Sequence, residues 1–147
     1  LPMRESIAHL TSVEKQVSTH YIIGRDGALV QLVPLERRSW HSGVSELYGR
    51  PDVNSSSVGI DLVFVPGTDL GYTERQYEVL AELGRALMEG LPIVPGRLVG
   101  HEHVALPMGR KQDPGPSFDW SRFCKDMGVD ELPAVVRQAS QAAPSNY

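Results

Sequence analysis

The chain has 147 residues, which fits one domain that can bury its own hydrophobic core. Its 14 basic and 18 acidic residues give a net charge of -4, which argues against a nucleic-acid-binding protein, because such proteins usually carry a basic stripe. No apolar run approaches the length of a membrane span, and the single cysteine, Cys124, excludes an internal disulfide framework and a cysteine-rich zinc motif.

The first part of the chain predicts a short helix, a hairpin and a long loop. Apolar residues three positions apart in segment 4–12 are typical of one face of a helix. Two apolar, β-branched runs around an Asp-Gly turn, 20–24 and 28–34, predict a β-hairpin. Segment 35–56 is rich in Ser, Gly and charged residues, so we expect a long surface loop of functional importance.

The middle of the chain predicts a central strand followed by a long helix. Segment 57–65 is mostly apolar, as in a strand buried on both faces, and Asp61 interrupts it. Thr73 and Gln76 form a capping box ahead of apolar residues at helical spacing. We therefore expect a helix that begins there and ends before Pro92.

The last part of the chain predicts one more strand, 97–104, and a short helix, 118–127. Together the elements indicate an α/β (α+β) fold in which a central mixed β-sheet is flanked by helices. We expect one domain over residues 1–138. Residues 139–147 are rich in Ser, Ala, Gln and Pro and are predicted to form a flexible tail.

Metal-ligand side chains gather in GHEHVALPMGRKQDPGPSFDW, residues 100–120. On a strand, His101 and His103 would share one face, and a loop stiffened by Pro and Gly would bring Asp113 back toward them. Zinc accepts imidazole nitrogen and carboxylate oxygen, so the segment can form a metal site. The alternative, an isolated His-x-His pair followed by an ordinary Asp-Pro-Gly turn, stays open.

Charged and aromatic residues elsewhere also suggest a catalytic site. Lys111, beside Asp113, can stabilise a developing oxyanion or be a solvated loop lysine. A buried carboxylate is costly when unpaired, so Asp61 is either a general base acting on a metal-bound water or the structural partner of an Arg or a backbone amide. Trp40 and His41 predict a wall of the substrate site, with a packed Trp beside a surface His as the alternative.

Five motifs follow one another along the chain: QVSTHYIIGRDGALVQLVP, RSWHSG, NSSSVGIDLV, YTERQYEVLAELGRAL and LVGHEHVALPMGRKQDPGPSFDW. In this order, over about residues 5–123, the chain resembles zinc-dependent N-acetylmuramoyl-L-alanine amidases of the AmpD type. Phage lysozyme-amidases and peptidoglycan recognition proteins share their fold. The resemblance implies a mixed β-sheet flanked by helices, zinc in a cleft, and hydrolysis of the amide between N-acetylmuramic acid and L-alanine in peptidoglycan or muropeptides.

The resemblance also implies roles for individual residues. His101 and Asp113 match two of the three zinc ligands, and Lys111 matches the lysine that stabilises the oxyanion. Asp61 matches the acid that acts on the zinc-bound water, where Glu is usual. Three residues match the lining of the muropeptide groove: Trp40, His41 and Asn54. His103 stands where relatives often carry Asp, so it is not assigned as a ligand.

One expected zinc ligand is missing from this sequence. The family's remaining ligand is a His at the end of a strand upstream of the first helix, and the sequence begins just beyond that point. We expect this strand to precede Leu1 in a longer chain. Two alternatives stay open: a substitute ligand such as His9, and a zinc-free remnant that only binds peptidoglycan.

The remaining expectations concern partners and location. We expect a bacterial or phage protein that is a monomer, binds peptidoglycan or muropeptides, and binds no nucleic acid. The expected location is the cell envelope, in the periplasm or secreted, with the cytoplasm as the alternative. A peptidase that cleaves other amides is a third functional class, and it would keep the zinc without requiring the sugar.

Overall fold

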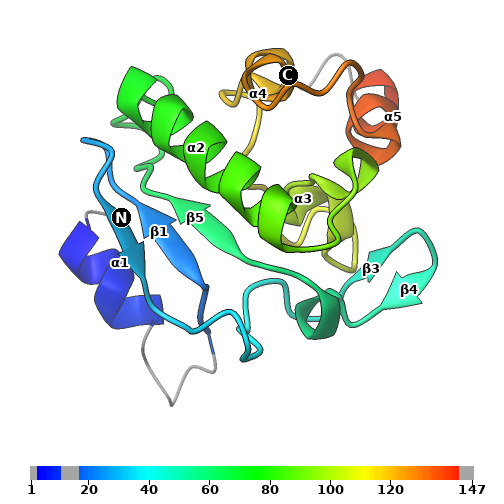
Figure 1. The fold of residues 1–147 in the computed structure, drawn as a ribbon, viewed down its shortest axis with the longest axis horizontal. Helices are drawn as coiled ribbons and strands as arrows, with labels where there is room; N and C mark the ends of the chain where they lie inside the picture. The colour runs from blue at the N-terminus through cyan, green and yellow to red at the C-terminus, as the bar shows by residue number, and fades with distance from the viewer. Residues whose placement is uncertain (1–2, 11–16, 143–147) are drawn as a thin grey trace.

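The computed structural model describes residues 3–10 and 17–142 (Figure 1). The helices and strands follow in the order α1 (Met3–Leu10), β1 (Tyr21–Ile23), β2 (Leu29–Gln31), β3 (Glu46–Leu47), β4 (Arg50–Pro51), β5 (Ile60–Leu62), α2 (Glu74–Gly90), α3 (His101–Val104), α4 (Trp120–Asp126) and α5 (Ala134–Ala142). Two 3₁₀ helices, Val53–Ser56 and Pro95–Arg97, precede β5 and α3. Within the described residues, no helix is long and apolar enough to cross a bilayer.

The main sheet is mixed and has the strand order β2-β1-β5. Strand β1 pairs antiparallel with β2 and parallel with β5. Successive residues of β1 point to opposite faces, so Ile22 packs toward α1 while Ile23 joins the cluster formed with α2. Figure 1 shows α2 running across one side of β1 and β5, with α1 on the other side. The predicted mixed sheet flanked by helices is confirmed.

Elements with strong local signals form where the sequence predicts them. The Asp-Gly turn joins β1 and β2 as a hairpin. Helix α2 begins after Thr73 with the predicted capping box, in which Thr73 Oγ1 accepts from the Gln76 N–H and the Gln76 side chain accepts from the Thr73 N–H. Helix α4 lies inside the predicted segment 118–127, and the predicted strand 57–65 is reduced to β5.

The predicted strand over 97–104 is wrong. Its first residue ends a 3₁₀ helix, and His101 to Val104 form the short helix α3. The reason is tertiary, because the backbone N–H of Glu102 donates to the carbonyl of Asp113 at 3.0 Å instead of joining a sheet. His101 and His103 therefore do not share a strand face. His103 is buried, and its Nδ1 accepts from the Gly100 N–H at 2.9 Å.

Two other regions differ in detail from the prediction. The expected loop 35–56 contains the small hairpin β3-β4 and a 3₁₀ helix, although most of it is irregular. Helix α5 continues through Ala142, four residues into the segment predicted to be a flexible tail. Residues 143–147 lie outside the described residues, so the boundary between domain and tail stays a prediction.

Gln76 joins α2 to the ends of two strands. Its side chain is fully buried, and Nε2 donates to the carbonyls of Val63, at 2.8 Å, and Ile23, at 3.4 Å. Its Oε1 accepts from the backbone N–H of Thr73 and from the guanidinium of Arg25. This one amide therefore fixes where α2 crosses the sheet that carries Asp61.

We predict that Gln76→Leu lowers the free energy of unfolding by about 2–4 kcal/mol, because it leaves buried carbonyls without a donor. Glu82→Gln, an exposed change on the same helix, is the control and should alter stability by less than about 0.5 kcal/mol. Urea unfolding monitored by circular dichroism measures both. Equal stability of the two variants would contradict the role given to Gln76.

A second prediction concerns His103, because its burial lowers its pKa to about 4. Between pH 6.5 and 4 the unfolded chain binds a proton at this position that the folded chain does not, so stability falls as the pH falls. In His103→Phe this loss is absent. Relative to the parent, the variant should gain roughly 2–3 kcal/mol between pH 6.5 and 4. Denaturant unfolding at both pH values, with chelator present, measures the difference, and parallel pH profiles would refute the assignment.

Candidate active site

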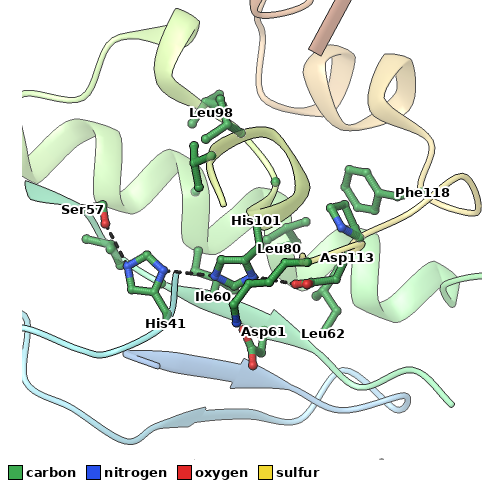
Figure 2. Close-up of a pocket in the computed structure, with 18 of the residues that line it drawn as sticks. His41, Ser57, Ile60, Asp61, Leu62, Leu80, Leu98, His101, Asp113 and Phe118 are labelled. Atoms are coloured by element: carbon green, nitrogen blue, oxygen red, sulfur yellow. Dashed lines mark hydrogen bonds and ion pairs between the residues drawn. The ribbon is translucent and has the colours of Figure 1, made fainter. Parts of the chain in front are cut away.

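A cavity of about 730 Å³ lies beside β5 and α2, and its wall includes the charged residues singled out from the sequence. They are Asp61 on β5, His101 at the start of α3, and Lys111 and Asp113 in the loop that follows. Figure 2 shows Asp61, His101 and Asp113 close together at this cavity. The fold thus brings together four of the residues predicted to act in catalysis or metal binding.

Three of these side chains form a group that can hold a metal ion. One donor atom from each of Asp61, His101 and Asp113 lies within 4.8 Å of the other two. The Oδ1 atom of Asp61 is buried and has no hydrogen-bond partner among the described residues. A buried carboxylate oxygen without a partner is costly, and a cation in this group would satisfy it. The donor set of imidazole and carboxylates therefore fits a divalent metal such as zinc.

Burial and the short distances between charged side chains shift the pKa values of all three residues of this group. Burial raises the pKa of Asp61, because the charged carboxylate loses its water. His101 Nδ1 lies 2.6 Å from Asp113 Oδ2. Burial pushes the pKa of His101 down and that of Asp113 up, but the hydrogen bond and opposite charge between them outweigh it, so the pKa of His101 is raised and that of Asp113 is lowered. The pair is thus a charged contact that a metal can replace.

Backbone contacts fix the loop that carries Asp113. The Glu102 carboxylate accepts from the Gly115 N–H at 3.3 Å, and the hydroxyl of Tyr72 donates to the Pro114 carbonyl at 2.8 Å. Gly100 allows the loop to approach α3 closely, since a Cβ there would lie 2.4 Å from Pro114 Cδ. The glycine before His101 is therefore required by the position of Asp113.

Lys111 points its charge toward the same group without being tied to it. No hydrogen bond or ion pair joins its ammonium to another described residue, yet it lines the cavity. Burial is the larger influence on Asp61 and Asp113, and the charge of Lys111 acts against it by favouring their ionised forms. A cation at this place can stabilise negative charge that develops on a substrate.

His41 lies next to His101, a contact between residues 60 positions apart. His41 Nδ1 is 3.0 Å from His101 Nε2, and His41 Nε2 is 2.8 Å from Ser57 Oγ. Burial, helped by the charge of His101, lowers the pKa of His41 to about 3, so its imidazole is neutral near pH 7. His41 thus contacts the candidate metal group through the Nε2 atom of His101.

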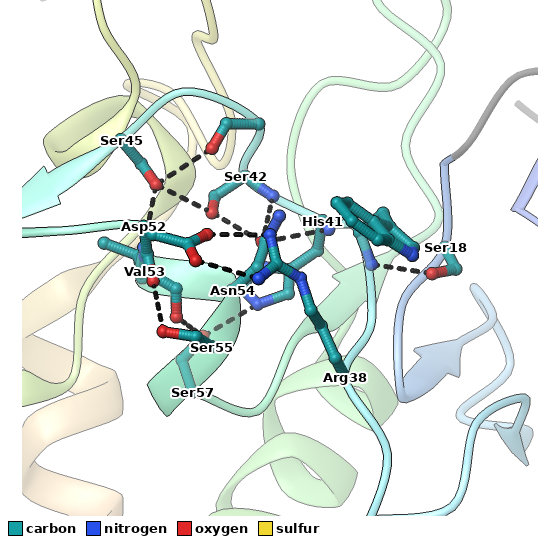
Figure 3. Close-up of polar contacts among 12 residues, drawn as sticks. Ser18, Arg38, His41, Ser42, Ser45, Asp52, Val53, Asn54, Ser55 and Ser57 are labelled. Carbon is teal, nitrogen blue, oxygen red and sulfur yellow. Dashed lines mark hydrogen bonds and ion pairs between the residues drawn. The ribbon is translucent and has the colours of Figure 1, made fainter.

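The other predicted groove residues, Trp40 and Asn54, have contrasting environments, and Figure 3 shows the contacts of Asn54. Asn54 is buried, and its Oδ1 accepts from the backbone N–H groups of His41 and Ser42 and from the Ser42 hydroxyl. It holds the loop that carries His41. Trp40 is 47% exposed, with the Arg38 guanidinium 4.1 Å from its ring. Contact of either residue with substrate stays a prediction.

Sequence reasoning missed two residues that shape the site. Ser57 supports His41 but stands last in a row of three serines, and no sequence signal distinguishes it from the others. Arg110 donates to the carbonyls of Ser42 and Val44 at 2.6 and 2.9 Å and so ties the loop after α3 to the loop of His41. His9 lines the same cavity, but it is not part of the group of donor atoms found among the described residues.

The chain matches known proteins over most of its length. The family model described as N-acetylmuramoyl-L-alanine amidase matches residues 2–116. The 1,6-anhydro-N-acetylmuramyl-L-alanine amidase AmpD of Escherichia coli K12 is 46% identical over 123 residues, which are 83% of this chain and 62% of that protein. The chain therefore spans less than two thirds of the length of this relative.

Solved structures give the same result. The Escherichia coli amidase AmiD, in complex with anhydro-N-acetylmuramic acid-L-Ala-D-γ-Glu-L-Lys, aligns with a TM-score of 0.76 at 29% identity, covering 89% of this chain and 55% of that one. AmpDh3 of Pseudomonas aeruginosa, in complex with anhydromuramic pentapeptide, aligns with a TM-score of 0.76 at 29% identity, covering 88% and 56%. The protein belongs to the N-acetylmuramoyl-L-alanine amidase family.

Proposed function

We propose that the protein is a zinc-dependent amidase that hydrolyses the bond between N-acetylmuramic acid and L-alanine in peptidoglycan or its muropeptides. The observation that carries the proposal is the buried, unpartnered oxygen of Asp61 beside His101 and Asp113 in a chain of this family. The related proteins are named for the 1,6-anhydro sugar or were solved with an anhydromuropeptide, which favours a 1,6-anhydromuropeptide as substrate.

In this proposal His101 and Asp113 hold the zinc. Bound zinc supplies Lewis acidity, which polarises a carbonyl and lowers the pKa of water to about 7. The loop contacts of Asp113 with α3 and Tyr72 keep its carboxylate in place without help from the metal. The imidazole–carboxylate pair is therefore preformed, which reduces the entropy lost on binding.

Asp61 and Lys111 act on the reacting groups. The Asp61 carboxylate takes the proton of the attacking water and passes it to the leaving amine of L-alanine. Burial raises the pKa of Asp61, which makes its carboxylate a stronger base than an exposed one. The Lys111 ammonium stabilises the negative charge that develops on the lactyl carbonyl oxygen.

The alternative is a non-catalytic module that only binds peptidoglycan. Such a module has no need for a buried carboxylate without a partner, whereas an amidase uses it as a base. The relatives that share 46% and 30% identity with this chain are both named as amidases, which also supports the catalytic function.

We predict that Asp113→Ala lowers muropeptide hydrolysis by at least about 100-fold and weakens zinc binding, because the metal loses a ligand. Release of free stem peptide from anhydromuropeptide by the full protein, together with zinc content by atomic spectroscopy, measures both. Asp119→Ala, a change at the N-cap of α4, is the control and should keep both properties.

The outcomes separate the functional classes. An Asp113→Ala variant with undiminished hydrolysis would contradict the assignment of Asp113 as a zinc ligand. Muropeptide binding that persists in chelator without any release of stem peptide would show the binding module instead. Cleavage of a stem peptide that lacks the muramic acid, at the same rate, would indicate a peptidase.

For Lys111 we predict a loss confined to the chemical step. Lys111→Met should lower kcat by about 10²–10³-fold with KM and zinc affinity changed little, because the ammonium acts on charge present in the transition state. Lys111→Arg keeps the cation and should retain more activity than Lys111→Met. Steady-state kinetics on anhydromuropeptide measure the effect. An equal rise in KM with unchanged kcat would show that Lys111 binds the ground state.

A further inference from the structure

His41 lines the same cavity as His101, but its side chain is held in place by its neighbours. Its side chain is buried, at 7% exposure, and both of its ring nitrogens have partners, His101 and Ser57. Figure 2 shows Ser57, His41, His101 and Asp113 as a continuous row joined by hydrogen bonds. No ring nitrogen of His41 is left to bind a muropeptide, which was its role in the sequence-based prediction.

The backbone around His41 holds its ring in one position. Gly59 packs directly against the ring, and a Cβ there would lie 2.6 Å from His41 Cγ. The backbone N–H of His41 donates to the buried Asn54 Oδ1 at 3.2 Å. The ring therefore has little room to turn away from His101.

The direction of the hydrogen bonds along this row follows from the Val53 carbonyl, which lies next to Ser57 at one end of it. The Val53 carbonyl can only accept a hydrogen bond, so the Ser57 hydroxyl, 2.6 Å away, donates its hydrogen to that carbonyl. Ser57 Oγ must then accept the N–H of His41 Nε2. A neutral imidazole carries one N–H, so His41 Nδ1 is an acceptor, and it takes the hydrogen of His101 Nε2.

The direction of these hydrogen bonds decides which nitrogen of His101 is available to a metal. With its hydrogen on Nε2, neutral His101 has its lone pair on Nδ1, the atom that lies 2.6 Å from Asp113 Oδ2. Ligating histidines commonly donate their second ring N–H to a fixed acceptor, and this outer partner sets the tautomer and ring orientation. A carboxylate or backbone carbonyl is the usual acceptor, and here a neutral imidazole takes that place.

We propose that His41 and Ser57 are positioning residues of the metal site, which hold His101 in the tautomer that presents Nδ1 to the zinc. The inference rests on the proposed zinc site. It assigns to His41 and Ser57 an effect on metal affinity that a substrate-groove residue would not have.

The first test compares zinc affinities by competition with a chromophoric chelator at constant pH. His41→Phe should bind zinc about 10–100-fold more weakly than the parent, the range typical of lost outer partners of a ligand. His41→Asn, which can place an acceptor oxygen near the position of Nδ1, should recover part of this loss. At saturating zinc, KM for anhydromuropeptide should change by less than about threefold in His41→Asn, whereas a groove residue would raise it.

A matched serine pair provides the control. Ser57→Ala removes the acceptor of the His41 Nε2–H and should weaken zinc binding by about 3–10-fold. Ser55→Ala, in the 3₁₀ helix that ends just before Ser57, removes an exposed hydroxyl that donates to the Asp52 carbonyl, and it should leave affinity unchanged. Urea unfolding of the metal-free variants shows that each is folded.

Imidazole ¹⁵N NMR of the zinc-loaded protein gives a second readout. The inference requires the His101 proton on Nε2 and the metal on Nδ1. Zinc affinity in His41→Phe equal to that of the parent, or a proton on His101 Nδ1, overturns the inference while hydrolysis by the parent still supports the amidase. A parent protein that binds no zinc overturns both.

Discussion

The carboxylate of Asp61 is the constraint on which the site depends. It lies half-buried on β5, with one buried oxygen that accepts no hydrogen bond from the described residues. Leaving a charge buried in this way costs several kcal/mol unless a partner neutralises it, so either a proton or a cation must accompany it. The raised pKa of Asp61 favours binding of a proton. Its neighbours His101 and Asp113 offer further donor atoms for a cation.

The rest of the structure keeps this unfavourable arrangement in place. Gln76 anchors α2 to the ends of β1 and β5, and the two faces of the sheet are covered by α2 and α1. The loop after α3 is tied down at Glu102 and Tyr72, so Asp113 cannot move away from Asp61 to relieve the repulsion between them. Packing energy elsewhere thus offsets the cost of keeping these two carboxylates close together.

How much the sequence predicts depends on how local each signal is. The hairpin around Asp26-Gly27 and the helix after Thr73 form as predicted, because a turn and a capping box involve residues a few positions apart. The strand expected over 97–104 fails for the opposite reason. Its apolar, β-branched residues favour extended backbone, but the carbonyl of Asp113, in the following loop, accepts from the Glu102 N–H and favours a short helix instead.

The same distinction holds for the site. The residue types and family resemblance identify His101, Asp113, Lys111 and Asp61, and the structure brings these four to one cavity. The neighbour of His101 could not be predicted, because the contact with His41 spans 60 positions and follows no periodicity. The sequence predicts that His41 lines the substrate groove, and only the tertiary packing shows that it contacts His101.

The most direct test of this account is anomalous diffraction at the zinc edge from crystals of the zinc-loaded protein. The account predicts an anomalous peak bonded to His101 Nδ1 and to a carboxylate oxygen of Asp113, at about 2.0–2.2 Å from each. It also predicts that His101 Nε2 keeps its contact with His41. A peak that is bonded to His101 Nε2, or one that lies away from His101 and Asp113, would contradict it.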